Sequence, residues 1–365
     1  MPGFEDAATA PVYHPRFVEQ IRGASVLRFM DWRLTNDSEL AHWQDRATPE
    51  RSQATPRGAS FETMIDIANH VNADPWFCIP HLADDEFVEK LAMLARERLV
   101  PGRVVYVEYS NEVWNGIFAQ ANYVMDQGCK AGLDRLPPNE GTCADDGARM
   151  WAGVKWTAQR AAQIFVIFER VFGGSDRLVR VLGGQAAGAA RNSVLLEAFN
   201  DAAFNPHGVR ADALAIAPYF GGVVAERFHA KPPSSLPVDT IIKLAEATIP
   251  SEVRDSTREN KRIADYFGLR LVAYEGGQHL VGEGDDKLTE AIIAANRDPR
   301  MAALYQKMFD AWYAESGREL MVLFNSAEQP GQHGSWGLLE SPEQPIERAP
   351  KYRAFRERLT ALGQH

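Results

Sequence analysis

Two glutamates in this sequence directly follow apolar runs that have the composition of buried β-strands. Glu112 comes after Asn111 at the end of VVYVEYSNE, and Glu275 ends LRLVAYE. Carboxylates and amides are costly to bury without partners, so each position is either a strand end open to water or a place for chemistry. Two carboxyl groups that face each other acquire different pKa values, so one can act as a nucleophile while the other holds a proton. Such a pair, about 5–5.5 Å apart, is what retaining cleavage of a glycosidic bond requires.

Short apolar runs recur along the chain and predict the strands that must position these glutamates. Each run is rich in Val, Ile, Leu and aromatic residues and is too short to form a helix. Continuous apolarity is typical of parallel strands that are covered on both faces. The runs are SVLRFM (25–30), PWFCIP (75–80), RVVYVEYS (103–110), RLVRVLGG (177–184), ALAIAPY (213–219), LRLVAYE (269–275) and LMVLFN (320–325).

Amphipathic stretches between these runs predict helices, because their apolar residues recur at three- and four-residue steps. The stretches are residues 61–72, 84–99, 148–172 and 303–315. Alternating strands and helices build a parallel sheet, and this many strands in 365 residues indicate an α/β fold of the (β/α)8 TIM-barrel type. An open doubly wound sheet is the alternative, but the sequence has no G-x-G-x-x-G after a strand.

The chain is predicted to form one catalytic barrel domain over residues 1–365. Inserted loops near residues 128–147 and 220–250 are expected to shape a substrate cleft. A helix is predicted over residues 14–22 and no strand is evident before it, so the first barrel strand is expected upstream of Met1 or in an irregular N-terminal segment. Cys129 and Cys143 flank a loop with Pro-Pro and Gly, and they either staple this loop in an exported protein or are unrelated thiols.

The order of these motifs resembles clan A of the glycoside hydrolases, a large group of retaining (β/α)8 enzymes. VYVEYSNE is similar to the fourth strand of that clan, and even Glu108, three positions before the Asn, matches a common pattern. AYEGG is similar to its seventh strand. The resemblance implies that Glu112 is the acid/base, Glu275 the nucleophile and Asn111 a donor to the sugar 2-hydroxyl.

Two further residues take their roles from the same resemblance, which covers residues 25 to about 337. Arg28 lies where the clan's second strand often carries an Arg, and Tyr219 where its sixth strand often carries a Tyr. The resemblance implies that both donate hydrogen bonds to the nucleophile, which favours the ionised form of Glu275. The sequence departs from the clan at Val113, where Pro is common.

Other side chains are suited to binding a sugar. Indole rings stack on the flat C–H faces of sugars, while amides and imidazoles bind the hydroxyl groups. Packing at a barrel rim is the alternative for each Trp, and His81 has a cap of the following helix as its alternative. Trp336 lies in GQHGSWG, well after the last predicted strand. Either the chain returns so that the Trp336 ring forms the bottom of the sugar-binding site, or another group forms it. The candidates are Trp32, His81, Trp114, Gln278, His279 and Trp336.

Charge and composition exclude several classes of function. A net charge of −10 argues against a nucleic-acid partner, which needs a basic face. No apolar run approaches the roughly 18 residues that span a membrane, and the acidic N-terminus is not a signal peptide. The chain has no H-E-x-x-H, P-loop or G-x-S-x-G motif, so we expect neither a metal nor another cofactor, and no serine nucleophile.

The sequence therefore predicts a retaining glycoside hydrolase that cleaves β-glycosidic bonds in a poly- or oligosaccharide by double displacement. Endo action is expected because long loops and several Trp residues suit an open cleft. The alternative is a non-catalytic carbohydrate-binding barrel protein. A secreted or periplasmic location is expected for a polymeric substrate, and an upstream segment with a signal and the first strand would account for both missing features.

Overall fold

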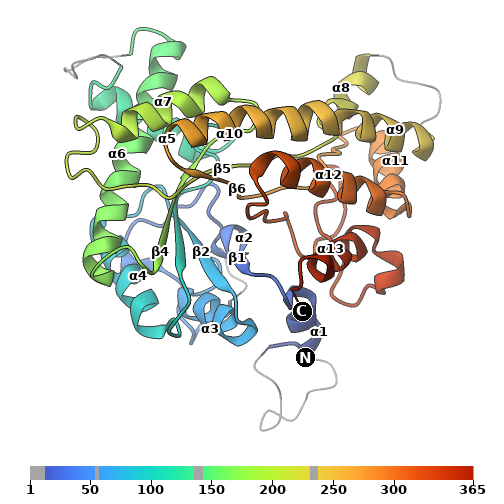
Figure 1. Cartoon of the computed structure of the whole chain (residues 1–365), viewed down its shortest axis with the longest axis horizontal. Helices are drawn as coiled ribbons and strands as arrows, with labels where there is room; N and C mark the ends of the chain where they lie inside the picture. The colour runs from blue at the N-terminus through green and yellow to red at the C-terminus, as the bar shows by residue number, and fades with distance from the viewer. Residues whose placement is uncertain (1–12, 54–56, 135–142, 231–236, 365) are drawn as a thin grey trace. The chain divides into compact units, whose positions relative to one another are not determined.

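The strands within residues 26–273 form a parallel sheet (Figure 1). The computed structural model describes residues 13–53, 57–134, 143–230 and 237–364. The sheet has six strands in chain order, and the pairs from the first to the fifth are parallel. A doubly wound sheet would reverse its strand order part-way, so the sequential order excludes that alternative. The strands are β1 (Val26–Arg28), β2 (Asp74–Ile79), β3 (Val105–Tyr109), β4 (Leu178–Gly183), β5 (Ala213–Ile216) and β6 (Arg270–Ala273).

The seventh predicted run, residues 320–325, pairs with β6 at its last residue, Ala273. The backbone N–H of Ala273 donates to Leu320 O at 2.9 Å, and Val322 N–H donates to Ala273 O at 3.0 Å. These bonds form a parallel bridge between Ala273 and Met321. All seven predicted runs therefore occupy successive strand positions, as a (β/α) barrel requires. A further strand was expected upstream of Met1 or in an irregular N-terminal segment. Residues 1–12 lie outside the described part, and residues 13–25 contain a helix at Pro15–Ile21 and no strand.

Two compact units emerge from the contacts within the chain. The sheet unit comprises residues 26–216 and 260–272, and the helical unit comprises residues 1–25, 217–259 and 273–365. The expectation of a single catalytic domain stays a prediction. None of the described helices is both long and apolar enough to cross a membrane.

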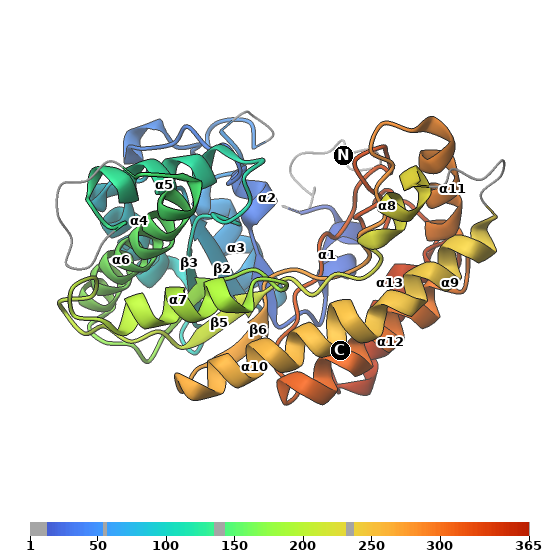
Figure 2. The same ribbon diagram turned by 90° about the horizontal axis from the view of Figure 1, so that it is seen from above.

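Helices of the sheet unit follow the strands, as predicted. In α4 the side chain of Asp84 accepts a hydrogen bond from Phe87 N, so Asp84 is the expected N-cap. Helix α4 packs on both α3 and α6, and α6 packs on α5 and α7 (Figure 2). The helices are α2 (Met30–Arg33), η1 (Trp43–Asp45), α3 (Phe61–Val71), α4 (Asp85–Arg98), α5 (Ala119–Lys130), α6 (Asp146–Phe172) and α7 (Ala189–Asn200).

The helical unit begins with the helix predicted for residues 14–22. Helix α12 packs on α13, and α9 packs on α11. The chain passes into the sheet unit within α10. The helices are α1 (Pro15–Ile21), α8 (Val223–Ala230), α9 (Val238–Thr248), the π-helix η2 (Ile249–Asp255), α10 (Ser256–Tyr266), α11 (Asp286–Arg297), α12 (Met301–Ser316), η3 (Ile346–Arg348) and α13 (Pro350–Ala361).

The two predicted insertions have different contents. Cys129 and Cys143 form a disulfide with their Cα atoms 5.5 Å apart, which decides between the two interpretations of these thiols. Residues 135–142 within that loop lie outside the described part. The segment 220–250 contains α8 and α9, with residues 231–236 again outside the description.

Candidate active site

The turn after β3 presents Glu112 through an unusual backbone. All five residues of β3 are buried, so the polar residues begin where the strand leaves the sheet. Ser110 has φ 59° and Glu112 has φ 41°, in the left-handed region that non-glycine residues seldom adopt. Such residues persist only where their surroundings hold them, and they concentrate at functional sites. The Glu112 carboxylate is half-buried and accepts a hydrogen bond from Asn115 Nδ2 at 2.9 Å.

A buried ion pair anchors this turn to the sheet. Arg28 donates to Glu108 Oε2 from Nε at 3.0 Å and from Nη2 at 2.8 Å, and each side chain is 2% exposed. Trp76 Nε1 donates to the same oxygen at 2.9 Å. A buried charge needs several partners of this kind, and Glu108 has them. Arg28 Nη2 also donates to Asn111 Oδ1 at 2.8 Å, so the ion pair fixes the residue that precedes Glu112.

Amide groups complete the support of Asn111, whose side chain is buried. Asn111 Nδ2 donates to Asn36 Oδ1 at 3.0 Å, and Gln120 Nε2 donates to Asn111 O at 2.9 Å and to Asn36 Oδ1 at 2.7 Å. An amide nitrogen carries two N–H donors, and the bond to Asn36 uses one of them. The arrangement therefore holds Asn111 in one orientation and leaves it a second N–H.

His81 is buried at the end of β2 and does not cap the following helix, because Asp84 does so. Its ring lies edge-on to Tyr123, with the centroids 5.1 Å apart. Burial lowers the pKa of His81 below its usual value, and the charge of Asp37 opposes this only in part. The imidazole is therefore neutral at pH 7, and hydroxyl binding by it stays a prediction.

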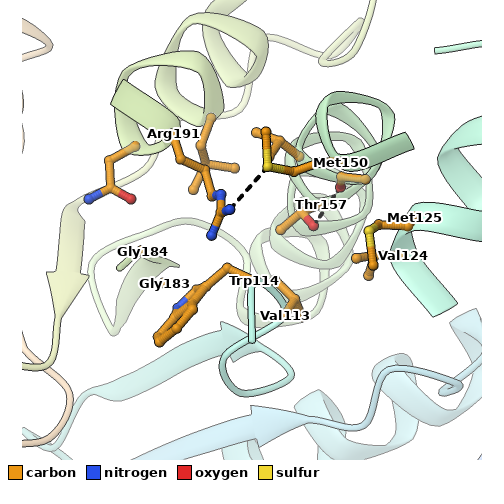
Figure 3. Close-up of a pocket in the computed structure, with 13 residues that line it drawn as sticks. Val113, Trp114, Val124, Met125, Met150, Thr157, Gly183, Gly184 and Arg191 are labelled. Carbon is orange, nitrogen blue, oxygen red and sulfur yellow. Dashed lines mark hydrogen bonds between the residues drawn. The ribbon is translucent and has the colours of Figure 1, made fainter. Parts of the chain in front are cut away.

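Two of the predicted Trp residues belong to the sheet unit. Trp32 lies in the short helix α2, and its ring packs against Phe29 with centroids 5.5 Å apart, so sugar binding by Trp32 stays a prediction. Trp114, two residues after Glu112, is half-buried and walls a pocket between α5, α6, α7 and the end of β4 (Figure 3). Trp114 is thus placed to contact a ligand near Glu112.

In the helical unit Tyr219 holds the second glutamate. The Tyr219 hydroxyl donates to Glu275 Oε2 at 2.9 Å, the contact that the resemblance implied for this Tyr. Glu275 is 5% exposed, so most of its carboxylate is shielded from water. Gly277 follows with φ 148°, and a Cβ there would lie 3.0 Å from the Tyr305 hydroxyl, which explains a glycine at this point of AYEGG.

An aromatic cluster surrounds Tyr219. The Trp336 ring lies 5.6 Å from that of Tyr219 and 5.1 Å from that of His279, measured between centroids, and both contacts are edge-on. Trp336 thus lies against the ring of Tyr219, and its part in flooring the site stays a prediction. Trp336 Nε1 donates to His333 O at 3.0 Å, which fixes the plane of the indole. Burial lowers the pKa of His279, so this imidazole is also neutral at pH 7.

Gln278 was expected to line the cleft, but its side chain is buried and hydrogen-bonded to the backbone. It is 1% exposed, its Nε2 donates to Ser335 O at 2.9 Å, and its Oε1 accepts from Leu280 N at 2.7 Å. These bonds tie the loop after Glu275 to the loop that carries Trp336. Contact between Gln278 and a substrate stays a prediction.

Several supporting residues were not predicted from the sequence, namely Asn36, Trp76 and Gln120. Of these, only a donor to Glu108 such as Trp76 had a local indication in the sequence. Glu108 is a carboxylate inside an otherwise apolar strand, and a buried carboxylate needs hydrogen-bond donors. Glu112 belongs to the sheet unit and Glu275 to the helical unit. Their approach to each other, and the expected contact of Arg28 with Glu275, stay predictions.

No protein-family model and no curated protein matches the chain. Among solved structures, the chain is similar to an endo-β-1,4-mannanase double mutant of Cellulomonas fimi, with a TM-score of 0.46 and 13% identity over 94% of this chain and 72% of that one. An endo-1,4-β-xylanase from Caldicellulosiruptor owensensis gives a TM-score of 0.42 and 12% identity over 86% and 84% of the two chains. An endo-1,4-β-D-mannanase from Thermotoga petrophila RKU-1 gives 0.39 and 10% over 92% and 98%. A likeness at this level does not define the chemistry of the site.

Proposed function

We propose that the protein is a retaining glycoside hydrolase that cleaves β-glycosidic bonds in a poly- or oligosaccharide. The observation that carries the proposal is the hydrogen bond from Tyr219 to the shielded carboxylate of Glu275, beside the ring of Trp336. A phenol that donates to a carboxylate favours its ionised form, which is the form a nucleophile needs. The adjacent indole offers the flat apolar face on which a sugar ring stacks.

The turn after β3 supports the acid/base role of Glu112. Its carboxylate is half-buried, and its backbone is held by the network of Arg28, Glu108 and Asn111. Such a supported side chain can hold a proton at a fixed place, as a general acid must. The second N–H of Asn111 is the donor that we assign to the sugar 2-hydroxyl.

The reaction has two steps in this proposal. First, a Glu275 oxygen attacks the anomeric carbon while Glu112 gives its proton to the glycosidic oxygen, so the leaving sugar departs as an alcohol. Second, Glu112 takes a proton from water, whose oxygen attacks the anomeric carbon and releases Glu275. Both steps are displacements at one carbon, and the two inversions give net retention.

The decisive experiment is a screen of the full chain against plant, algal and microbial β-glycans and aryl β-glycosides, with E275A beside it. We expect release of oligosaccharides from at least one polymer, and a loss of at least 10³-fold in kcat for E275A. E97Q, a change at an exposed helix position, is the matched control and should retain the wild-type rate.

A second variant tests Glu112 separately. E112Q should slow substrates with poor leaving groups most, and azide should restore part of the rate because it needs no general base. Normal turnover by E275A would refute the nucleophile assignment. Glycan binding without hydrolysis by the wild type would instead favour the non-catalytic alternative.

A further inference from the structure

A pocket beside the turn after β3 has a chemistry of its own. It has a cavity volume of about 40 Å³ and lies between α5, α6, α7 and the end of β4 (Figure 3). Its walls are mostly apolar and include Val124, Met150 and Leu195. Four polar side chains also line it: those of Thr157 and Asn192 are hydrogen-bonded to Gly153 O and to Gln185, and those of Arg191 and Trp114 are hydrogen-bond donors. A pocket of this size holds one functional group of a ligand, and its polar side chains decide which group that is.

Arg191 brings a positive charge into this pocket from the first turn of α7. Nη1 donates to Gln185 Oε1 at 3.0 Å and Nη2 contacts Met150 Sδ at 3.1 Å, and both of these partners are neutral. A guanidinium has five N–H donors in a fixed fork, and these contacts leave others for a ligand. None of the residues lining the pocket, all in the described part of the chain, is acidic.

Trp114 adds a second donor. Its Nε1 is buried and has no hydrogen-bond partner among the described residues. An indole N–H can only donate, and so can a guanidinium. The two groups therefore call for a ligand atom that accepts hydrogen bonds, and the charge of Arg191 calls for a negative one. A carboxylate meets both demands and matches the guanidinium fork in a bidentate manner.

The pocket adjoins the proposed acid/base. Trp114 follows Glu112 by two residues in the chain. Gly183, at the end of β4, also lines the pocket, and a Cβ there would lie 2.7 Å from Glu108 Oε1. The floor is therefore backbone that lies directly against the residues that support Glu112. A group bound here therefore lies beside the turn that carries Glu112.

We propose that this pocket binds the carboxylate of an acidic sugar unit, such as a uronic acid of a β-glycan. Arg191 pairs with the carboxylate, and the Trp114 N–H donates to it. The sugar part of this inference rests on the proposed function. A neutral carbonyl group would satisfy the Trp114 N–H but would leave the Arg191 charge without a counter-ion.

Two probes that differ only at C6 test the inference. Methyl β-D-glucuronide carries a carboxylate there, and methyl β-D-glucoside a hydroxymethyl group. Ligand-observed NMR titrations of the full chain should give a Kd at least tenfold lower for the glucuronide, because charge-assisted bidentate bonds are the strong ones. R191M should reduce this preference to less than twofold. R191K should keep part of it, since lysine retains the charge but not the planar fork.

A matched control is available in the same unit. Arg210 is exposed and lies outside the pocket, so R210M should keep the full preference. Thermal unfolding checks that each variant folds, and R191Q, which has a polar head group, replaces R191M if the latter does not. Raising the salt concentration should weaken glucuronide binding and leave glucoside binding unchanged.

Equal binding of the two probes by the wild type, or an unchanged preference in R191M, would overturn the inference. Acetate that competes as tightly as the glucuronide would also overturn it, because the pocket would then bind anions without a sugar. These titrations need no turnover. An Arg191-dependent preference in a chain that hydrolyses no glycan refutes the proposed function alone, and hydrolysis without the preference refutes this inference alone.

Discussion

One hydroxyl group joins the aromatic cluster of the helical unit to Glu275. Replacing Tyr219 with Phe keeps the ring contacts and removes only the 2.9 Å hydrogen bond. A hydrogen bond to a charged group contributes about 1.5–3 kcal/mol, so we expect kcat/KM of Y219F to fall about 10- to 100-fold. Steady-state kinetics on an aryl β-glycoside measures this. Y266F is the control, because the Tyr266 side chain is 85% exposed. An unchanged kcat/KM in Y219F would remove this hydroxyl from the mechanism.

Lys351 is a buried lysine that should make the stability of the protein depend on pH. It is 6% exposed in α13 and its Nζ donates to Ser335 O, the carbonyl that Gln278 also contacts. Burial lowers the pKa of Lys351 from 10.5 to about 7, against the opposing charges of Glu340 and Glu328. Between these pH values the unfolded chain binds more protons than the folded chain, so stability rises with pH.

Replacing Lys351 with Met should remove this contribution to the pH dependence. The wild type should gain up to about 1.4 kcal/mol per pH unit relative to K351M between pH 7 and pH 10.5. Below pH 7 the difference in unfolding free energy between the two proteins should be constant. Urea unfolding followed by circular dichroism across this range measures both slopes. Parallel slopes above pH 7 would show that Lys351 does not titrate as described.

At the scale of elements, the ion pair between Arg28 of β1 and Glu108 of β3 fixes the position of Asn111, the residue before Glu112. Arg28→Met would leave the Glu108 carboxylate buried without its main partner, which costs about 3–5 kcal/mol in comparable pairs. We therefore expect a large fall in unfolding free energy for R28M and a partial recovery in R28M/E108Q. R22M removes an exposed pair with Glu19 and should change stability by less than about 1 kcal/mol. Equal effects of R28M and R22M would contradict the role given to the buried pair.

The elements themselves could be predicted because their signals are local. Each apolar run, such as PWFCIP or ALAIAPY, carries its strand tendency within six or seven residues, and Asp84 marks a helix start on its own. The amide network could not be predicted. Asn36 and Asn111 are 75 residues apart in the sequence, and nothing in the sequence around one asparagine indicates that it bonds to the other. The resemblance supplied the Tyr219–Glu275 contact, but it did not indicate the Arg28–Glu108 pair.

At the scale of the whole molecule, the proposed mechanism draws its residues from both units. Glu112 and its network belong to the sheet unit, while Glu275, Tyr219 and Trp336 belong to the helical unit. Neither unit carries two carboxylates in the proposed roles. The proposed double displacement therefore sets a condition on the assembled chain, namely that these two carboxyl groups come to about 5–5.5 Å from each other.

The stereochemical course of hydrolysis measures that condition directly. A separation of about 5–5.5 Å lets Glu275 attack the anomeric carbon, so a β-glycoside should first release the β-anomer. Proton NMR of the anomeric signals, recorded within minutes of adding enzyme and before mutarotation, identifies the first product. A separation of about 6.5–9.5 Å would leave room for water between sugar and carboxylate and would release the α-anomer. Appearance of the α-anomer would assign Glu275 as a general base rather than a nucleophile. The reaction would then proceed without a glycosyl-enzyme intermediate, although E275A would still lose activity.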